Sequence, residues 1–239
     1  FNFSDDQEQL RDAVSKWVER GYDFERRRGI TAAGGFSRDA YNELAELGLT
    51  GLTLSEPLGG LGMGPVESMV VMEALGHGIV LEPLAQALMA GVLLSNYAQP
   101  AVQQAWAGPL ATGEALMVLA TQERKNRYRL DQCTTQAERQ GDGWVLKGAK
   151  SVVPVADQAD AFIVPAMANG KLALFVVARS AAGVSTTGYL TQDGGRAGEL
   201  TLQGAPAQCL TEDGLTALEH AVDVGIAALS AEAIGVMDK

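Results

Sequence analysis

Four basic residues gather in a short segment of an otherwise acidic chain, whose formal net charge is −11. The segment also holds a tyrosine, and its residues are Arg124, Lys125, Arg127, Tyr128 and Arg129. It follows a compact apolar run at 115–120, so we expect it at a strand end or in a loop, where binding residues often lie. Guanidinium and ammonium groups in such a cluster suit an anionic ligand that bears phosphates. The alternative is a solvated loop whose charges balance nearby acids.

The residue types that build metal centres and nucleophilic sites are scarce. The chain has two histidines, His77 and His220, and two cysteines, Cys133 and Cys209. Their wide separation argues against a zinc site, so we predict that no metal is bound. Two cysteines are also too few for a disulfide framework, and reduced thiols in a cytoplasmic protein are the simpler interpretation. The sequence contains no Gly-x-Ser-x-Gly elbow and no Gly-Lys-Ser/Thr phosphate loop.

Composition describes a globular chain and excludes several classes of protein. The 239 residues are 47% hydrophobic and 20% charged, which is unlike a disordered chain. The acidic balance argues against nucleic acid as the main partner, because binding phosphates requires a basic surface. The uncharged stretch 83–113 is strongly apolar only over 84–94, which is shorter than the about 20 residues that span a bilayer. We therefore predict a buried helix there and no membrane span.

The first part of the chain has the periodicity and capping signals of α-helices. Ser4 opens a capping-box pattern, and Ser37 precedes a second amphipathic stretch. Pro65, Pro83 and Pro100 stand where first helical residues are expected. Near residue 115 the pattern changes to short apolar runs separated by turns, with hairpin signals such as Asn169-Gly170. Such closely spaced strands predict a small barrel or sandwich.

Helical periodicity returns from Gly214 to the end of the sequence. Its apolar stripe needs partner helices that do not follow in the sequence, so we expect a truncated piece of a longer protein. The predicted stripe consists of Leu215, Leu218, Val222, Ile226, Leu229, Ala233 and Val236. We thus predict an α+β fold with an N-terminal helical domain, a middle β-barrel domain and the first helix of a truncated C-terminal helical domain. The expected bounds are 1–114, 115–212 and 213–239.

Five stretches of the chain, in order, resemble the acyl-CoA dehydrogenase family. They are FSDDQEQLRDAVSKWV, the stretch from FSRDAYNELAELG through PLGGLGMG to MEALG, GDGWVLKGAKSVV, TQDGGRAGELTLQGAPA and AEAIGVMDK. The resemblance implies an N-terminal helical domain, a middle β-barrel and a C-terminal four-helix bundle, with FAD between the barrel and the bundle. It also implies removal of a proton from the α-carbon of an acyl-CoA and of a hydride from the β-carbon, which passes to the flavin.

The resemblance also assigns site residues. The cofactor-binding residues that it implies are Val118, Ala120, Thr121, Val152 and Val153, and the implied substrate-binding residues are Arg127 and Tyr128. Gln122 and Glu123 replace the Glu-Pro pair usual in the family, and Pro154 stands where a hydroxyl residue is usual. Proline has no backbone N–H to donate. The positions of the base and arginine of some branches correspond to Gly225 and Ile226, so the catalytic base is unknown.

These departures are similar to those of the branch typified by the small subunit of pimeloyl-CoA dehydrogenase. The leading hypothesis is an FAD-dependent acyl-CoA dehydrogenase or one of its subunits. It implies an acyl-CoA substrate, electron-transfer flavoprotein as electron acceptor, and a homo-oligomer or a hetero-oligomer with another such subunit. A non-catalytic structural partner subunit is the first alternative. A flavin monooxygenase or oxidase is the second, because one fold supports several activities.

Overall fold

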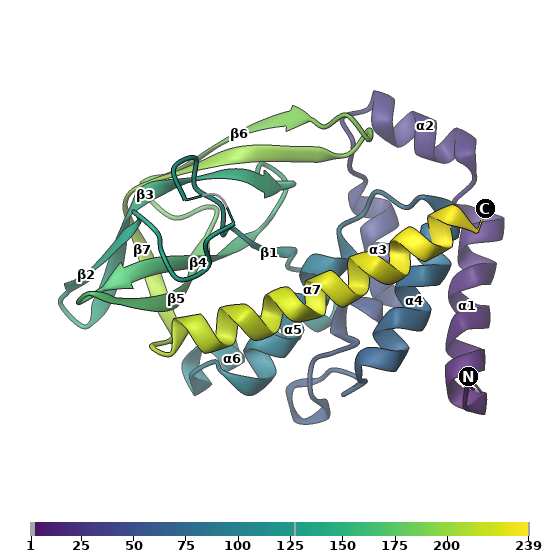
Figure 1. Ribbon diagram of the computed structural model, residues 1–239, viewed down its shortest axis with the longest axis horizontal. Helices are drawn as coiled ribbons and strands as arrows, with labels where there is room; N and C mark the ends of the chain where they lie inside the picture. Colours follow the sequence, from purple (N-terminus) through teal and green to yellow (C-terminus); the bar gives the residue numbers. More distant parts are fainter. Residues whose placement is uncertain (1–2, 127, 239) are drawn as a thin grey trace.

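A helical part and a β part lie side by side, and one long helix runs across the helical part (Figure 1). The computed structural model describes residues 3–126 and 128–238. Within them, the helices of the N-terminal part end at Ala111, the strands run from Met117 to Thr211, and a helix occupies Gly214–Met237. This order confirms the predicted α+β fold. The domain bounds remain predictions, because the ends of helices and strands do not by themselves define where one domain stops and the next begins.

The helical part begins and ends its elements where local signals indicate. It comprises α1 (Asp5–Gly21), α2 (Phe24–Ala32), α3 (Arg38–Glu46), two short 3₁₀ turns at Leu49–Gly51 and Glu56–Leu58, α4 (Pro65–Gly78), α5 (Leu84–Asn96) and α6 (Pro100–Ala111). Ser4 forms the expected capping box with Gln7, and the Ser37 hydroxyl accepts from the Ala40 N–H. Pro65 and Pro100 are first helical residues, whereas Pro83 is the N-cap of α5.

Seven strands form the β part, and pairing closes five of them into a ring in the described chain. The strands are β1 (Met117–Leu119), β2 (Gln136–Gln140), β3 (Gly143–Pro154), β4 (Ala161–Ala168), β5 (Lys171–Ala178), β6 (Val184–Leu190) and β7 (Arg196–Thr211). The ring runs β4-β2-β3-β7-β5 and returns to β4, while β1 pairs with β4 and β6 with β7. Asn169 and Gly170 have φ of 50° and 77°, the left-handed pair that a tight β4–β5 hairpin requires.

Strand β1 joins the two hydrophobic cores. Met117 and Leu119 pack into the core of the helical part, and Val118 and Ala120 pack into the interior of the barrel. A strand that is buried on both faces reads as a continuous apolar run rather than an alternating one. Because both faces of β1 are buried, the segment that follows it starts where the barrel meets the helices.

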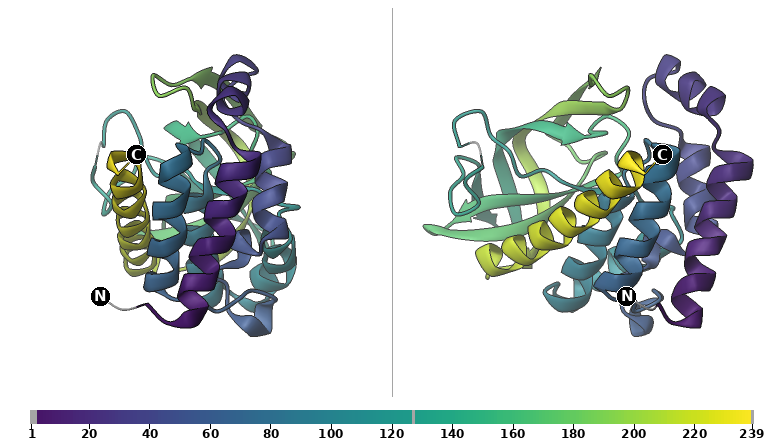
Figure 2. Two further views of the ribbon diagram at one scale, coloured as in Figure 1. Left: turned by 90° about the vertical axis from the view of Figure 1, so that its right-hand side faces the viewer. Right: turned by 45° about the vertical axis from the view of Figure 1, so that its right-hand side comes forward.

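Helix α7 (Gly214–Met237) packs on α4 and α5, beside which it runs in Figure 2. The buried positions are Gly214, Ala217, Leu218, Ala221, Gly225, Ala228, Ala231 and Gly235. Two residues of the predicted apolar stripe, Ile226 and Leu229, are 59% and 56% exposed, so this part of the stripe is not covered within the described residues. The helices cross so closely that large side chains do not fit between them: the Cα atom of Gly76 lies 3.1 Å from the position that a Cβ atom on Gly235 would take. By length and composition α7 is also apolar enough to cross a membrane, so the absence of a membrane span is not established.

Candidate functional site

Two chain segments that the sequence implicated lie next to each other where the barrel meets α7. Thr121 and Gln122 follow β1, and Ser151 and Val152 belong to β3. The Ser151 N–H donates to the Gln122 carbonyl at 2.9 Å. Val152 stands in an irregularity of the β3–β7 ladder, with φ of 53° and 51% of its surface exposed. The backbone therefore presents Thr121 and Val152 at one edge, outside the barrel interior.

Cavities flank this edge. The cavity that we call the β3–α7 cavity has a volume of about 330 Å³ and lies between β3, the β6–β7 turn, α4, α7 and residues 80–86. It is lined by Val152 and Pro154 from β3 and by Leu229 and Glu232 from α7, among others. A second cavity, the loop cavity, has a volume of about 260 Å³ and is lined by Thr121, residues of 126–133, and Leu218 and Val222 of α7.

A buried ion pair fixes the segment after β1 to β3. The Lys150 ammonium lies 2.9 Å from Glu123 Oε1, and these two side chains are 0% and 4% exposed. The hydroxyls of Thr134 and Thr135 donate to the same carboxylate at 2.6 and 2.7 Å. Their backbone N–H groups donate to it at 2.6 and 3.0 Å. A buried carboxylate with this many donors is well satisfied, so the network holds three segments of chain in one arrangement.

The same donors set the electrostatics of the pair. Burial disfavours the charged form of Glu123, but hydrogen bonds from Lys150, Thr134 and Thr135 outweigh burial and lower the pKa of Glu123 to about 2. Sequence analysis treated Glu123 only as a departure from the family pattern and missed this role. Alternation along β3 places Lys150 on the inward face with Trp144 and Leu146, and this was the available signal.

The proposed cofactor-binding residues differ in what they can offer a ligand. Val118, Ala120 and Val153 are 0%, 0% and 1% exposed and pack inside the barrel. The Ala120 N–H already donates to the Ile163 carbonyl at 2.9 Å. Thr121 lines the loop cavity and Val152 lines the β3–α7 cavity. Of the five residues, Thr121 and Val152 therefore have side chains at the cavities, and the roles of all five remain predictions.

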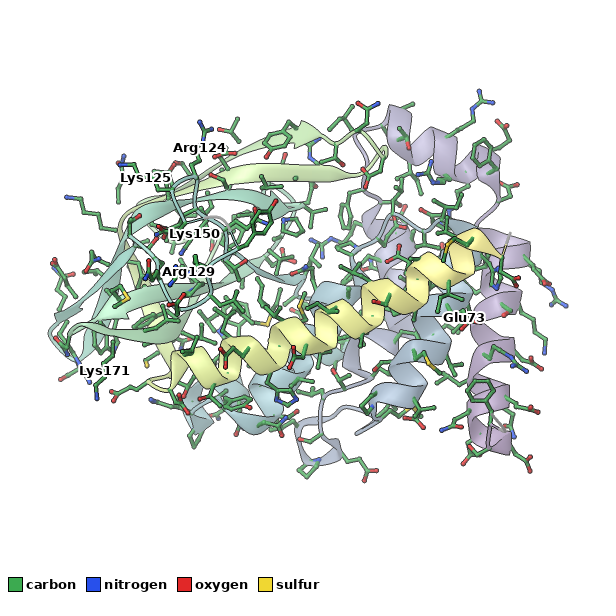
Figure 3. All side chains as sticks on the ribbon, viewed as in Figure 1. Glu73, Arg124, Lys125, Arg129, Lys150 and Lys171 are labelled. Carbon is green, nitrogen blue, oxygen red and sulfur yellow. The ribbon has the colours of Figure 1, made fainter. Side chains whose placement is uncertain are left out.

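Two residues of the basic segment, Tyr128 and Arg129, line the loop cavity. Arg129 makes a bidentate contact with Asp131 at 2.8 and 2.9 Å, and Arg124 lies 3.4 Å from Glu199. Tyr128 is 87% exposed, and Arg127 lies outside the described residues. Figure 3 shows Arg124, Lys125 and Arg129 over the β part of the molecule. Acids therefore balance part of this charge, as the alternative interpretation expected.

Neither thiol nor metal chemistry gains support from the described residues. Cys133 and Cys209 are free thiols, and burial raises the pKa of both. Among the residues that the structure describes, no group of three His, Cys, Asp or Glu side chains could hold a metal ion.

The N-terminal part of the chain matches a known domain. Residues 4–114 match the family model described as acyl-CoA dehydrogenase, N-terminal domain. This part of the chain is similar to the N-terminal domain of acyl-CoA dehydrogenases. The match ends just before β1, so membership of the remaining residues depends on whole-chain similarity.

Curated relatives and solved structures extend the similarity beyond this domain. The chain is 32% identical over 171 residues to acyl-CoA dehydrogenase FadE27 of Mycobacterium tuberculosis, which covers 71% of this chain and 44% of the relative. The ChsE4-ChsE5 complex of Mycobacterium tuberculosis contains a chain with 26% identity and a TM-score of 0.84, over 99% of this chain and 65% of that one. The Tcur3481-Tcur3483 steroid ACAD, solved as a variant, gives 27% identity and a TM-score of 0.87, over 96% of this chain and 63% of that one.

The comparisons confirm the acyl-CoA dehydrogenase fold and support membership of the family. The chain spans about half the length of the curated relatives that it matches, with 44% and 49% coverage of FadE27 and FadE12. The activity, substrates and partners of the whole protein are therefore proposals, and so are the small-subunit branch and the truncation.

Proposed function

We propose that this chain is part of an FAD-dependent acyl-CoA dehydrogenase that removes hydrogen from the α- and β-carbons of an acyl-CoA thioester. The proposal rests on the edge formed by Thr121 and Val152. Val152 lines a cavity that extends to α4 and α7, and Thr121 lines a second cavity next to the basic loop. A flat ring and an extended thioester need such an arrangement, because the reacting atoms must be held in contact and in a fixed orientation. The relatives named acyl-CoA dehydrogenases add support.

The residues at this edge fit the flavin of FAD in part. The exposed face of Val152 offers an apolar surface beside a ring, and Thr121 offers a hydroxyl and an amide. Pro154, which also lines the β3–α7 cavity, has no N–H to donate. When bound, the flavin supplies the acceptor for a hydride, and this chain contributes orientation and exclusion of water. Other donors that serve the ring would come from chain beyond the described residues.

The loop cavity suits the thioester arm of an acyl-CoA. Its wall includes Thr121, Gln122 and Leu218, and Tyr128 and Arg129 of the basic segment also line it. Cationic groups at the mouth would favour the phosphates of coenzyme A, and the narrower interior would hold the uncharged arm. Electron-transfer flavoprotein is the proposed electron acceptor, and a homo- or hetero-oligomer of acyl-CoA dehydrogenase subunits is the proposed assembly.

A non-catalytic partner subunit is the second candidate. It is favoured by Pro154 at the proposed flavin strand and by the altered loop at residues 124–128. One of the similar structures, ChsE4-ChsE5 of Mycobacterium tuberculosis, is a complex. We propose that this protein likewise belongs to the small-subunit branch, in which two unlike subunits complete one site.

The absorption spectrum of the purified full-length protein, alone and with its partner subunit, tests the proposal. The expected result is a flavin spectrum that acyl-CoA bleaches under anaerobic conditions. A steroid-derived acyl-CoA belongs among the substrates tried, given the steroid ACAD to which the fold is similar. A preparation that stays colourless after addition of FAD would support the non-catalytic partner. Rapid oxygen consumption during turnover would instead indicate an oxidase or monooxygenase.

A further inference from the structure

A glutamine in the first turn of α5 lies in the wall of the β3–α7 cavity. Gln86 is the only polar side chain between Leu84 and Leu94, and every other residue of that stretch is buried. Its own side chain is half-buried and lines the cavity. Helix α5 packs on β1, and Gln86 Oε1 accepts from the Leu119 N–H at 2.9 Å. This bond ties Gln86 to the strand that leads directly to Thr121.

The hydrogen bond to β1 also decides which way the amide group points. The oxygen of a glutamine accepts and its nitrogen carries two N–H donors, so the partner of one atom assigns the other. Because Oε1 accepts from Leu119, the Nε2 group is the end that is left for another partner. No described residue accepts from Nε2, and this atom is not among the buried, closed-off atoms that lack a partner. Gln86 therefore offers an oriented and unused donor at the cavity.

The other side-chain donors in the cavity wall are already engaged. All three nitrogens of the Arg196 guanidinium donate, to Asp157 and to a backbone carbonyl. The Thr191 hydroxyl donates to Asp193. The remaining polar side chains of the wall carry carboxyl groups, which accept hydrogen bonds when ionised; they are Glu82, Asp193 and Glu232. Among the described residues that line the cavity, Gln86 is thus the one whose side chain has a donor atom without an acceptor.

We propose that Gln86 donates a hydrogen bond to the acceptor edge of the flavin ring, on the side of the site where Pro154 offers no donor. The inference rests on the proposed function, because it requires FAD at the edge formed by Thr121 and Val152. The ring nitrogens and carbonyl oxygens of an oxidised flavin accept hydrogen bonds, and a donor that is already oriented loses little freedom on binding. The first turn of α5 adds the positive end of a helix dipole, which favours acceptor atoms.

Gln86 is thus a cofactor-binding residue and has no role at the reacting carbons of a substrate. It adds one donor from within the chain to those that come from beyond the described residues. The hydrogen bond to Leu119 gives it a second, structural role, because that bond holds the amide in place and anchors β1 to α5. An experiment must therefore separate the donor from the anchor.

The Gln86→Glu variant makes this separation. One carboxylate oxygen can still accept from the Leu119 N–H, while the other cannot donate as long as the group is ionised. At about pH 8 the full-length protein, with its partner subunit where one is needed, should bind FAD about tenfold more weakly than the unaltered protein, the equivalent of one hydrogen bond. Fluorescence titration with FAD in the absence of acyl-CoA measures this affinity.

Acid should restore part of the affinity of Gln86→Glu. Protonation returns an O–H donor to the new carboxyl group, and burial beside an acceptor favours the protonated form. The FAD affinity of this variant, relative to that of the unaltered protein, should rise between about pH 8 and about pH 5.5. A role limited to anchoring β1 would give no such rise, since both forms of the carboxyl group keep an acceptor for the Leu119 N–H.

Two further variants serve as controls. Gln86→Met removes donor and acceptor together, so it should bind FAD about tenfold more weakly without a relative rise in acid; it keeps the test decisive if Gln86→Glu does not fold. Gln103→Glu is the matched control, because Gln103 is a half-buried glutamine of α6 that donates to the Leu94 carbonyl at 2.9 Å and lines neither cavity. This variant should bind FAD like the unaltered protein.

Three results would overturn the inference. The first is unchanged FAD affinity in the Gln86 variants, and the second is a loss in Gln86→Glu that shows no relative recovery in acid. The third is unchanged FAD affinity with weaker binding of acyl-CoA, which would assign the donor to the thioester. Failure of the unaltered protein to bind FAD, alone and with its partner subunit, would instead refute the proposed function itself, and the inference with it.

Discussion

The carboxylate of Glu123 shows how one residue can hold the whole site edge. It receives donors from Lys150 and from both Thr134 and Thr135. Its segment directly follows Thr121 and Gln122, while Lys150 directly precedes Ser151 and Val152. The buried pair is thus a clamp between the two stretches of backbone that present the edge. Removing one partner leaves a buried charge without compensation, which is more damaging than removing both.

The clamp predicts a specific pattern of stability in a double-mutant cycle. Lys150→Met and Glu123→Leu should each lower the free energy of unfolding by about 3–5 kcal/mol. The double variant should lose less than the sum of the two single losses, since no unpaired charge remains. Urea unfolding of the four proteins measures these values. Additive losses would show that the two side chains act independently.

Acid should weaken the clamp. The pKa of Glu123 falls from its usual 4.5 to about 2 in the folded protein, so the folded state binds fewer protons than the unfolded state between these values. The resulting stability is fully present above about pH 4.5 and disappears as the pH falls toward 2, a loss on the order of 3 kcal/mol.

Unfolding measured across this pH range, compared between the unaltered protein and Glu123→Gln, isolates the effect from other carboxyl groups. Glu82 and Glu232 have raised pKa values and contribute in the opposite direction, but they are common to both proteins. Parallel curves for the two proteins would contradict the assignment.

Thr121 is the polar residue at the edge that the family resemblance singles out. If FAD binds there, Thr121→Ala in the full-length protein should weaken FAD binding by no more than about tenfold, the equivalent of one hydrogen bond. Fluorescence titration with FAD measures the change. Unchanged affinity would remove Thr121 from the site and favour the non-catalytic partner.

At the scale of elements, local sequence signals predicted most of the fold. Ser4, Ser37, Pro65 and Pro100 act through their immediate neighbours, so the starts of their helices could be read from sequence. Helix α2 was not predicted, because its stretch FERRRGITA is mostly polar and has little apolar periodicity. The edge formed by Thr121 and Val152 was predicted from the family resemblance. The Glu123–Lys150 pair was not predicted, because its two residues are 27 positions apart and no spacing motif links them. Pairing of that kind depends on strand register, which the sequence does not state.

The contact between α4 and α7 explains which side of α7 is buried. A Cβ atom on Gly235 would lie 2.0 Å from the Glu73 carbonyl oxygen, and one on Gly76 would lie 2.2 Å from the Glu232 carbonyl oxygen. The spacing of apolar residues identifies a stripe of large side chains, but the buried side of α7 consists mainly of glycine and alanine. Close approach of backbones selects glycine and alanine there and leaves Ile226 and Leu229 on the other side.

Adding a methyl group at this crossing should be costly. We expect Gly76→Ala to lower the free energy of unfolding by about 1–3 kcal/mol, because the helices must separate to admit it. Gly108→Ala is the matched control, since Gly108 lies within α6 with no atom within 4 Å of its Cβ position; it should stabilise the protein by about 0.5–1 kcal/mol. Urea unfolding compares them. Equal effects would mean that α4 and α7 pack less closely than described.

At the scale of the whole molecule, α7 presents an uncovered apolar face. Ile226, Leu229, Ile234, Val236 and Met237 are 59%, 56%, 51%, 41% and 78% exposed. Contiguous exposed apolar surface of this kind usually marks an interface. Helices of the bundle that the family fold implies, from the same chain or from another subunit, would cover it. The aligned part of this chain covers 44% of FadE27 and 49% of FadE12.

We therefore predict that the full-length protein is a dimer or a tetramer, homomeric or with an unlike subunit. Light scattering at micromolar concentration, alone and after co-expression with a partner subunit, should give the mass of such an assembly. Replacing Ile226 and Leu229 together by lysine should weaken the assembly or the packing of the bundle, because a charged ammonium cannot be buried there without a partner. Asp223→Lys, at an exposed polar position of α7, should leave the mass unchanged. A monomeric mass for the unaltered protein under both conditions would show that the face is covered within one chain, and the proposed assembly would then be wrong.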